Sequence, residues 1–251
     1  MLLEGKTSVI YGGGGSIGGA VARAFAREGA KVFLAGRTEA RLDKVAAEIR
    51  AGGGVAQTEE VDALDERAVD EHADAVAAAA GGIDIVFNLI SHGDVQGTPL
   101  AEMALEDFER PIRTAVRTMF LTSRAAARHM IKQGSGVIMA FGGYGDPMPG
   151  YYLGGLQVAF QAVEALRRSL ACELGPHGIR VVTLQTAGVP ESIQESFAGR
   201  AAITQAIERR TMLNRAATLE DVGNVAVFAA SGWAAAVTAT AINITCGAQV
   251  D

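Results

Sequence analysis

The sequence has few of the features that mark secreted, membrane or nucleic-acid-binding proteins. Its 251 residues include only two cysteines, Cys172 and Cys246, so no disulfide framework is expected and a reducing, cytoplasmic setting is favoured. Its apolar runs are interrupted before the ~20 residues that a bilayer crossing requires. The 22 basic and 28 acidic residues give a net charge of −6 without a run of one sign, which favours neither nucleic acid nor a membrane as partner.

The chain has enough apolar residues to bury the core of one domain spanning residues 1–251. Hydrophobic side chains make up 49% of it, and no repeat or low-complexity linker divides it. Runs rich in Val, Ile, Phe and Leu alternate with segments of helical period, and near-continuous apolar runs are typical of strands covered on both faces. The predicted strands are residues 7–11, 31–35, 55–61, 83–89, 136–141, 180–185 and 241–244. This pattern predicts an α/β fold with a doubly wound parallel sheet and a ligand beyond the carboxyl ends of the strands.

A glycine-rich turn follows the first predicted strand. Residues 6–20 read KTSVIYGGGGSIGGA, in which Gly13, Gly15 and Gly18 match G-x-G-x-x-G. Glycines let the backbone approach phosphates closely, and the helix predicted to begin near Ser16 directs free N–H groups at an anion. The turn therefore predicts a dinucleotide site, with a purely structural turn as the alternative.

The end of the second predicted strand indicates which dinucleotide is preferred. Residues 34–38 read LAGRT, so Gly36 stands where an NAD-binding acidic residue is expected. Arg37 follows it and offers a planar set of donors to a 2′-phosphate. NADP is therefore favoured over NAD, although Arg37 is alternatively a solvated residue at a helix start.

The order of motifs resembles that of the short-chain dehydrogenases/reductases over nearly the whole chain. The glycine turn is similar to the family's T-G-x-x-x-G-I-G, with Tyr11 for Thr and Ser16 for the middle glycine. Residues 84–91 read DIVFNLIS where D-I-L-V-N-N-A-G is usual. Residues 169–181, SLACELGPHGIRV, and 214–222, NRAATLEDV, are close to S-L-A-x-E-L-x-x-x-G-I-R-V and G-R-x-x-x-P-E-E-V. The resemblance implies a three-layer Rossmann fold whose mostly parallel sheet has seven strands.

The resemblance also implies which residues bind the cofactor. Asp62 corresponds to a position near the adenine, although an Asp after a strand is also an ordinary helix cap. Asn88 is carried over from N-N-A-G, or only braces the sheet. Val189 lies in segment 186–200, which corresponds to the family's mobile substrate loop. The implied cofactor contacts are Gly12, Gly14, Gly15, Ser16, Ile17, Gly18, Arg37, Asp62, Asn88 and Val189, and no metal site is predicted.

The four catalytic residues of the family are all replaced. Alignment through residues 169–171 places Leu156 at the catalytic Tyr and Phe160 at the Lys. The Ser falls on Gly143 and the Asn on Ala115. Since Leu and Phe transfer no protons, carbonyl reduction by the usual family mechanism is not expected.

Two interpretations of this loss remain open. In the first, the proton donor has moved to Tyr151, Tyr152 or His92, or to Tyr144, which all follow strands near the expected nicotinamide end. Enoyl reductases of this fold displace their Tyr upstream but keep the Lys. In the second, the chain is catalytically inactive and acts as a nucleotide-binding, small-molecule-binding or interaction module.

A homotetramer, or at least a homodimer, is expected from the resemblance. Family members associate through two long helices, and residues 156–174 carry apolar side chains on more than one face. Glu164, Arg167 and Arg168 in this stretch require solvent or pairing, which argues against a helix buried on every side.

Overall fold

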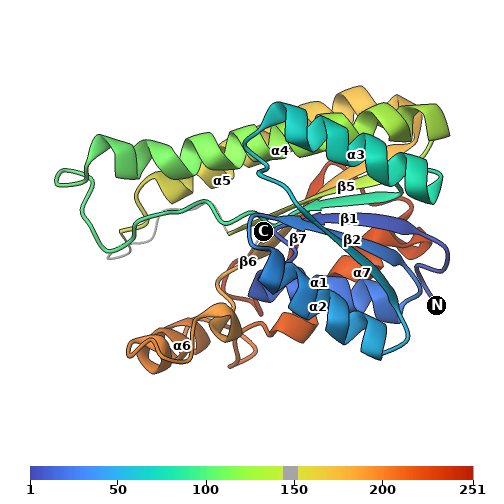
Figure 1. Cartoon of the computed structure of the whole chain (residues 1–251). Coiled ribbons are helices and arrows are strands. Elements are labelled where there is room, and N and C mark those ends of the chain that lie inside the picture. The colour runs from blue at the N-terminus through green and yellow to red at the C-terminus, as the bar shows by residue number, and fades with distance from the viewer. Residues whose placement is uncertain (144–151, 251) are drawn as a thin grey trace.

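A sheet of seven parallel strands separates two layers of helices (Figure 1). The computed structural model describes residues 1–143 and 152–250. The strand order is β3-β2-β1-β4-β5-β6-β7. The strands are β1 (Thr7–Tyr11), β2 (Lys31–Gly36), β3 (Val55–Glu60), β4 (Ile85–Asn88), β5 (Gly136–Gly143), β6 (Ile179–Thr186) and β7 (Thr240–Asn243). The predicted three-layer Rossmann architecture is therefore confirmed.

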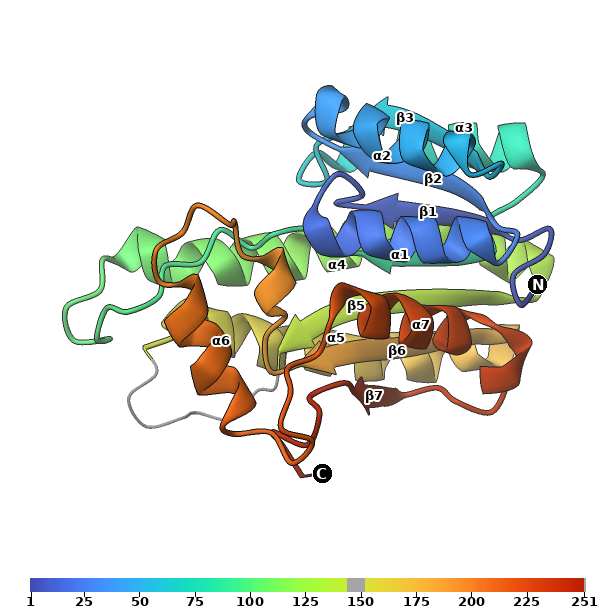
Figure 2. The same cartoon turned by 90° about the horizontal axis from the view of Figure 1, so that it is seen from below.

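Each face of the sheet has its own apolar core. One face packs on α1 (Ser16–Arg27), α2 (Glu39–Ala51) and α7 (Leu219–Ala230), which lie in front of the sheet in Figure 2. The other packs on α3 (Glu66–Ala80), α4 (Leu105–Gln133) and α5 (Gly155–Leu174). The short helix α6 (Arg200–Glu208) projects beside the carboxyl edge of the sheet. None of the helices within the described ranges is long and apolar enough to be a membrane span.

The seven predicted strands are all present, with bounds that differ by up to two residues at an end. The expectation of burial on both faces is wrong for the edge strand β3, where only Ala56 is buried. In β3, alternate side chains face solvent or polar partners, as when Thr58 donates to Asp43. An edge strand needs fewer apolar residues because it has a neighbour on one side only.

The helix α7 begins at a capping box formed by Thr218 and Asp221. The Thr218 hydroxyl accepts a hydrogen bond from the Asp221 N–H at 3.0 Å, and Asp221 accepts one from the Thr218 N–H at 2.9 Å. This reciprocal pair satisfies donors that a helix start otherwise leaves free. The hydrogen bond from Arg215, supported by those from Thr218, lowers the pKa of Asp221 to about 2.

Two of the three charged residues singled out in α5 are buried and paired. The Arg167 Nη2 atom lies 2.8 Å from the Glu164 Oε2 atom, and both side chains are largely excluded from solvent. Arg168 is exposed. The charged residues of α5 are therefore accommodated as expected: Glu164 and Arg167 pair with each other where they are buried, and Arg168 is exposed to solvent.

A polar pair, Tyr11 and His72, lies within the core between β1 and α3. The Tyr11 hydroxyl and His72 Nδ1 are 3.0 Å apart, and the two side chains are at most 2% exposed. Burial raises the pKa of Tyr11, so its hydroxyl keeps its proton and donates to the neutral imidazole. His72 Nε2 then carries the remaining proton and faces Glu59 Oε2 at 4.0 Å. Burial lowers the pKa of His72 to about 4.

From this pair we predict that part of the free energy of unfolding is lost at acidic pH. Between pH 6.5 and about 4 the unfolded chain protonates His72 while the folded chain does not, so stability falls as pH falls through this window. The loss amounts to about 3 kcal/mol at the acid end. His72→Gln, which keeps an acceptor for Tyr11 but does not titrate, should flatten this part of the pH profile in urea unfolding. The exposed His177→Gln is the control, and an unchanged slope in His72→Gln would contradict the assignment.

Candidate dinucleotide site with an apolar catalytic end

The glycine turn between β1 and α1 brings the backbone close to two other segments. Gly12 adopts φ +84°, and a Cβ there would collide with the carbonyl of Leu89. A Cβ on Gly18 would collide with the Gly12 carbonyl. These contacts require glycine, because any larger residue would force the turn away from the end of β4.

The same turn leaves the start of α1 open to a ligand. Gly15 is the N-cap of α1 and offers no side-chain acceptor to the first N–H groups of the helix. Gly15 and Ser16 are exposed, and Ile17 is partly exposed. Free N–H groups and the positive end of the helix dipole thus meet at an accessible backbone, which is the chemistry that binds a pyrophosphate.

Two exposed arginines, Arg37 and Arg41, follow β2 near this turn. Arg37 directly follows Gly36 at the end of β2. Arg41 lies in the first turn of α2, and a Cβ on Gly14 would be 2.9 Å from the Arg41 Cβ. Sequence reasoning missed Arg41, because its approach to Gly14 joins segments that are far apart in the chain.

Asp62 and Asn88 both make hydrogen bonds within the protein. The Asp62 carboxylate accepts from the Leu64 N–H at 3.0 Å, which is a turn-stabilising role. Asn88 is buried, donates to the Thr122 hydroxyl at 3.2 Å and accepts from the Ile90 N–H at 3.1 Å. Asn88 therefore links the end of β4 to α4. Val189 is buried after β6, with its carbonyl accepting from Ser192.

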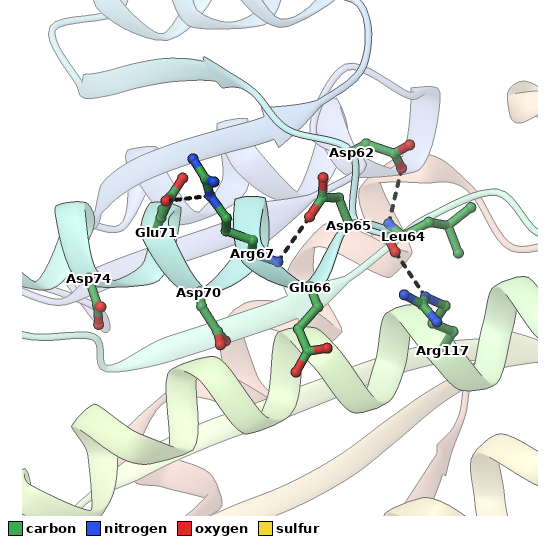
Figure 3. A pocket seen from close by; sticks show the side chains of 9 residues that line it. All are labelled: Asp62, Leu64, Asp65, Glu66, Arg67, Asp70, Glu71, Asp74 and Arg117. Carbon is green, nitrogen blue, oxygen red and sulfur yellow. Dashed lines mark hydrogen bonds and ion pairs between the residues drawn. The ribbon is translucent and has the colours of Figure 1, made fainter.

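An open acidic groove lies next to Asp62, along the start of α3 (Figure 3). Its volume is about 720 Å³, and its lining includes Asp65, Asp70 and Asp74 on one side and Arg117 on the other. The Arg117 Nε atom donates to the Leu64 carbonyl at 2.8 Å. The excess of carboxylates disfavours binding of an anion in this groove.

Small or apolar residues stand at all four positions implied to be catalytic. Ala115 is 1% exposed in α4, and Leu156 is 8% exposed in the first turn of α5. Gly143 ends β5, and a Cβ there would lie 2.6 Å from Phe160 Cε2. Phe160 thus occupies the space of a side chain at 143, a contact that alignment alone does not reveal.

Among the proposed replacement donors, His92 contacts Phe160, which stands at the family's Lys position. Its ring centroid is 6.1 Å from that of Phe160, with an edge-on angle of 62° between the rings. Burial lowers the pKa of His92, and Asp94 opposes the shift. Tyr152 is 50% exposed, with its carbonyl bound by the Gly97 N–H. Tyr151 and Tyr144 lie outside the described residues.

The sheet order and the glycine turn together define a dinucleotide-binding α/β protein of the Rossmann type. The chain belongs to the short-chain dehydrogenase/reductase family, since residues 13–249 match the family model described as enoyl-(acyl carrier protein) reductase.

Curated relatives and solved structures agree with this assignment. The chain is 32% identical over 236 residues to secoisolariciresinol dehydrogenase from Forsythia intermedia, covering 91% of this chain and 83% of that protein. It is 30% identical over 259 residues to meso-2,3-butanediol dehydrogenase from Serratia marcescens, covering 99% and 96%. The crystal structure of a short-chain type dehydrogenase/reductase from Mycobacterium marinum has a TM-score of 0.87 at 29% identity, covering 99% and 97%.

Proposed function

We propose that this protein is an NADP(H)-binding member of the family whose catalytic end has been rebuilt. The observation that carries the proposal is the contrast between the two ends of the site. The glycine turn keeps its close backbone approaches and an open helix start, whereas apolar residues occupy the four catalytic positions. The many dehydrogenase relatives support an oxidoreductase as the ancestral activity.

The residues present fit one part of the cofactor and not the other. The turn at Gly12–Gly18 suits the pyrophosphate, and Arg37 with Arg41 suits a 2′-phosphate. Phe160 offers no charge-assisted hydrogen bond to the nicotinamide ribose. When bound, NADPH would supply a hydride.

If the protein catalyses a reaction, we propose His92 as the group that exchanges a proton with the substrate. A neutral imidazole has one donor and one acceptor nitrogen, and its lowered pKa keeps it neutral at pH 7. Tyr152 is the less favoured candidate because it is 50% exposed to solvent. The second candidate function is a non-catalytic binding module, favoured by the apolar replacements at positions 156 and 160.

We further propose that the protein works in the cytoplasm as a homo-oligomer. Both cysteines are unpaired, which suits a reducing compartment. Phe120 on α4 and Val158 on α5 are each 45% exposed, so an apolar side chain on each of these two packed helices is open to a second copy.

The cofactor preference is tested by calorimetric titration with NADPH and NADH. We expect the wild type to bind NADPH more tightly. Arg37→Asp should weaken NADPH binding about tenfold to hundredfold, as expected for a charge-assisted hydrogen bond worth about 1.5–3 kcal/mol, and reverse the preference. Lys31→Ala, exposed at the opposite end of β2, is the matched control. Binding of NADH at least as tight as that of NADPH would refute the role of Arg37.

The catalytic proposal is tested by turnover of NADPH with a panel of ketones, aldehydes and enoyl thioesters. We expect no ordinary carbonyl reduction, because positioned acid-base catalysis contributes roughly 10²–10⁴ in rate and its usual groups are replaced. Where a substrate does turn over, His92→Ala should abolish the rate and Tyr152→Phe and Tyr151→Phe should not. Robust rates in all three variants would leave the reaction without a proposed proton donor and overturn this account.

The oligomer is tested by light scattering at micromolar concentration. We expect a dimer or tetramer for the wild type and a smaller species for the double variant Phe120→Glu with Val158→Glu, since two charges would oppose burial of the shared face. Val55→Glu, on the exposed start of β3, is the control. A wild type that shows only the 26.0 kDa monomer contradicts the proposal.

A further inference from the structure

Phe160 lies directly on the glycine backbone at the end of β5. Cβ atoms built on Gly142 and Gly143 would lie 3.6 Å from Phe160 Cδ1 and 2.6 Å from Phe160 Cε2. The first distance is an ordinary contact, whereas the second is shorter than real Cβ atoms show. A side chain at position 143 and the Phe160 ring in its present place therefore exclude one another.

The same ring contacts His92 on the loop that follows β4. The two rings meet edge to face, with centroids 6.1 Å apart. Aromatic pairs of this geometry contribute about 0.5–1.5 kcal/mol beyond the area that they bury, and they restrict the orientation of both rings. The ring of residue 160 thus connects β5 to the β4 loop.

The charged groups around His92 are largely engaged with one another. Asp94 lies on the same loop and opposes the effect of burial on the pKa of His92. From α4, Arg110 donates to the Gly93 carbonyl at 3.4 Å and pairs with Asp107 at 2.7 Å and Glu106 at 3.6 Å. Phe160 itself contributes an uncharged surface where the family's Lys would place a cation.

We propose that Phe160 is a positioning residue, whose ring takes the volume left free by Gly143 and holds the His92 imidazole at the carboxyl edge of the sheet. The replacements at positions 143 and 160 are then coupled, because the ring at position 160 fills the space that a side chain at position 143 would occupy. A neutral imidazole fixed in this apolar setting matches an uncharged ligand that carries a carbonyl or hydroxyl oxygen, and not an anion. The ligand class rests on the proposed function of His92, but the positioning does not.

The positioning is tested by following the imidazole proton signals of the protein by NMR as a function of pH, with His92→Gln to assign the signal. Phe160→Leu keeps an apolar side chain but removes the ring, and should raise the pKa of His92 toward its ordinary value as water reaches the imidazole. Phe160→Tyr keeps the ring and should restore the wild-type titration. An unchanged His92 titration in Phe160→Leu would overturn the proposal.

The exclusion between positions 143 and 160 is tested by a double-mutant cycle on thermal stability. Gly143→Ser should lower Tm and raise the pKa of His92 in the wild type, because the new side chain displaces the ring. In a protein that already carries Phe160→Ala, Gly143→Ser should change neither Tm nor the pKa of His92. Gly175→Ser is the control, because no atom lies within 4 Å of a Cβ at that position. Additive effects of the two substitutions would contradict the proposal.

The ligand class is tested separately, through binding of uncharged ketones and of matched carboxylates to the wild type and His92→Gln. If His92→Gln binds the ketones more weakly than the wild type does, the proposed ligand class is supported. Equal binding by both proteins, with the NMR result intact, would refute the proposed function of His92 and leave the positioning by Phe160 standing.

Discussion

The parallel direction of all seven strands is the constraint on which the site depends. Because every strand ends at the same edge, the glycine turn after β1, Arg37 after β2, His92 after β4 and Gly143 at the end of β5 converge there. β1 lies between β2 and β4, so the order of the strands reverses beside the glycine turn, where ligands of such sheets bind. The helical layers on the two faces hold the strands and therefore the edge where they end.

The two halves of this edge differ in what their residues offer a ligand. On the β1–β2 side, glycine is required by backbone collisions at Gly12 and Gly18, so the turn tolerates little change. On the β4–β5 side, Gly143, Leu156 and Phe160 stand where the resemblance implies polar catalytic residues. The close fit of Phe160 against Gly143 is the observation behind the proposal that this end of the site is repacked.

The positions of the strands and the glycine turn were predictable because each depends on local pattern: apolar period, β-prone runs and a phosphate-binding turn. The cap at Thr218 was predictable for the same reason. The exposure of β3 was not, since edge position is a property of the whole sheet. The burial of the Glu164–Arg167 pair, the approach of Arg41 to Gly14 and the contact of Phe160 with Gly143 also depend on segments far apart in the chain or on helix orientation. The alternative interpretation of Asp62 as a helix cap is wrong, since Asp65 caps α3 and Asp62 accepts from Leu64 in the preceding turn. The hydrogen bond of Asn88 to Thr122 matches its structural alternative, a brace for the sheet.

We propose that this protein binds a dinucleotide through the pyrophosphate and the 2′-phosphate. It lacks the charge-assisted hydrogen bond that the family's Lys makes to the nicotinamide ribose. The most direct test compares, by calorimetry, the affinity for NADPH with that for 2′-phospho-ADP, which keeps both phosphate sites and lacks the nicotinamide riboside. Since charge-assisted hydrogen bonds contribute about 1.5–3 kcal/mol each, the account predicts affinities within about tenfold of one another. A fragment that binds more than about a hundredfold more weakly than NADPH would show that the nicotinamide end still contributes strongly, and would contradict the account.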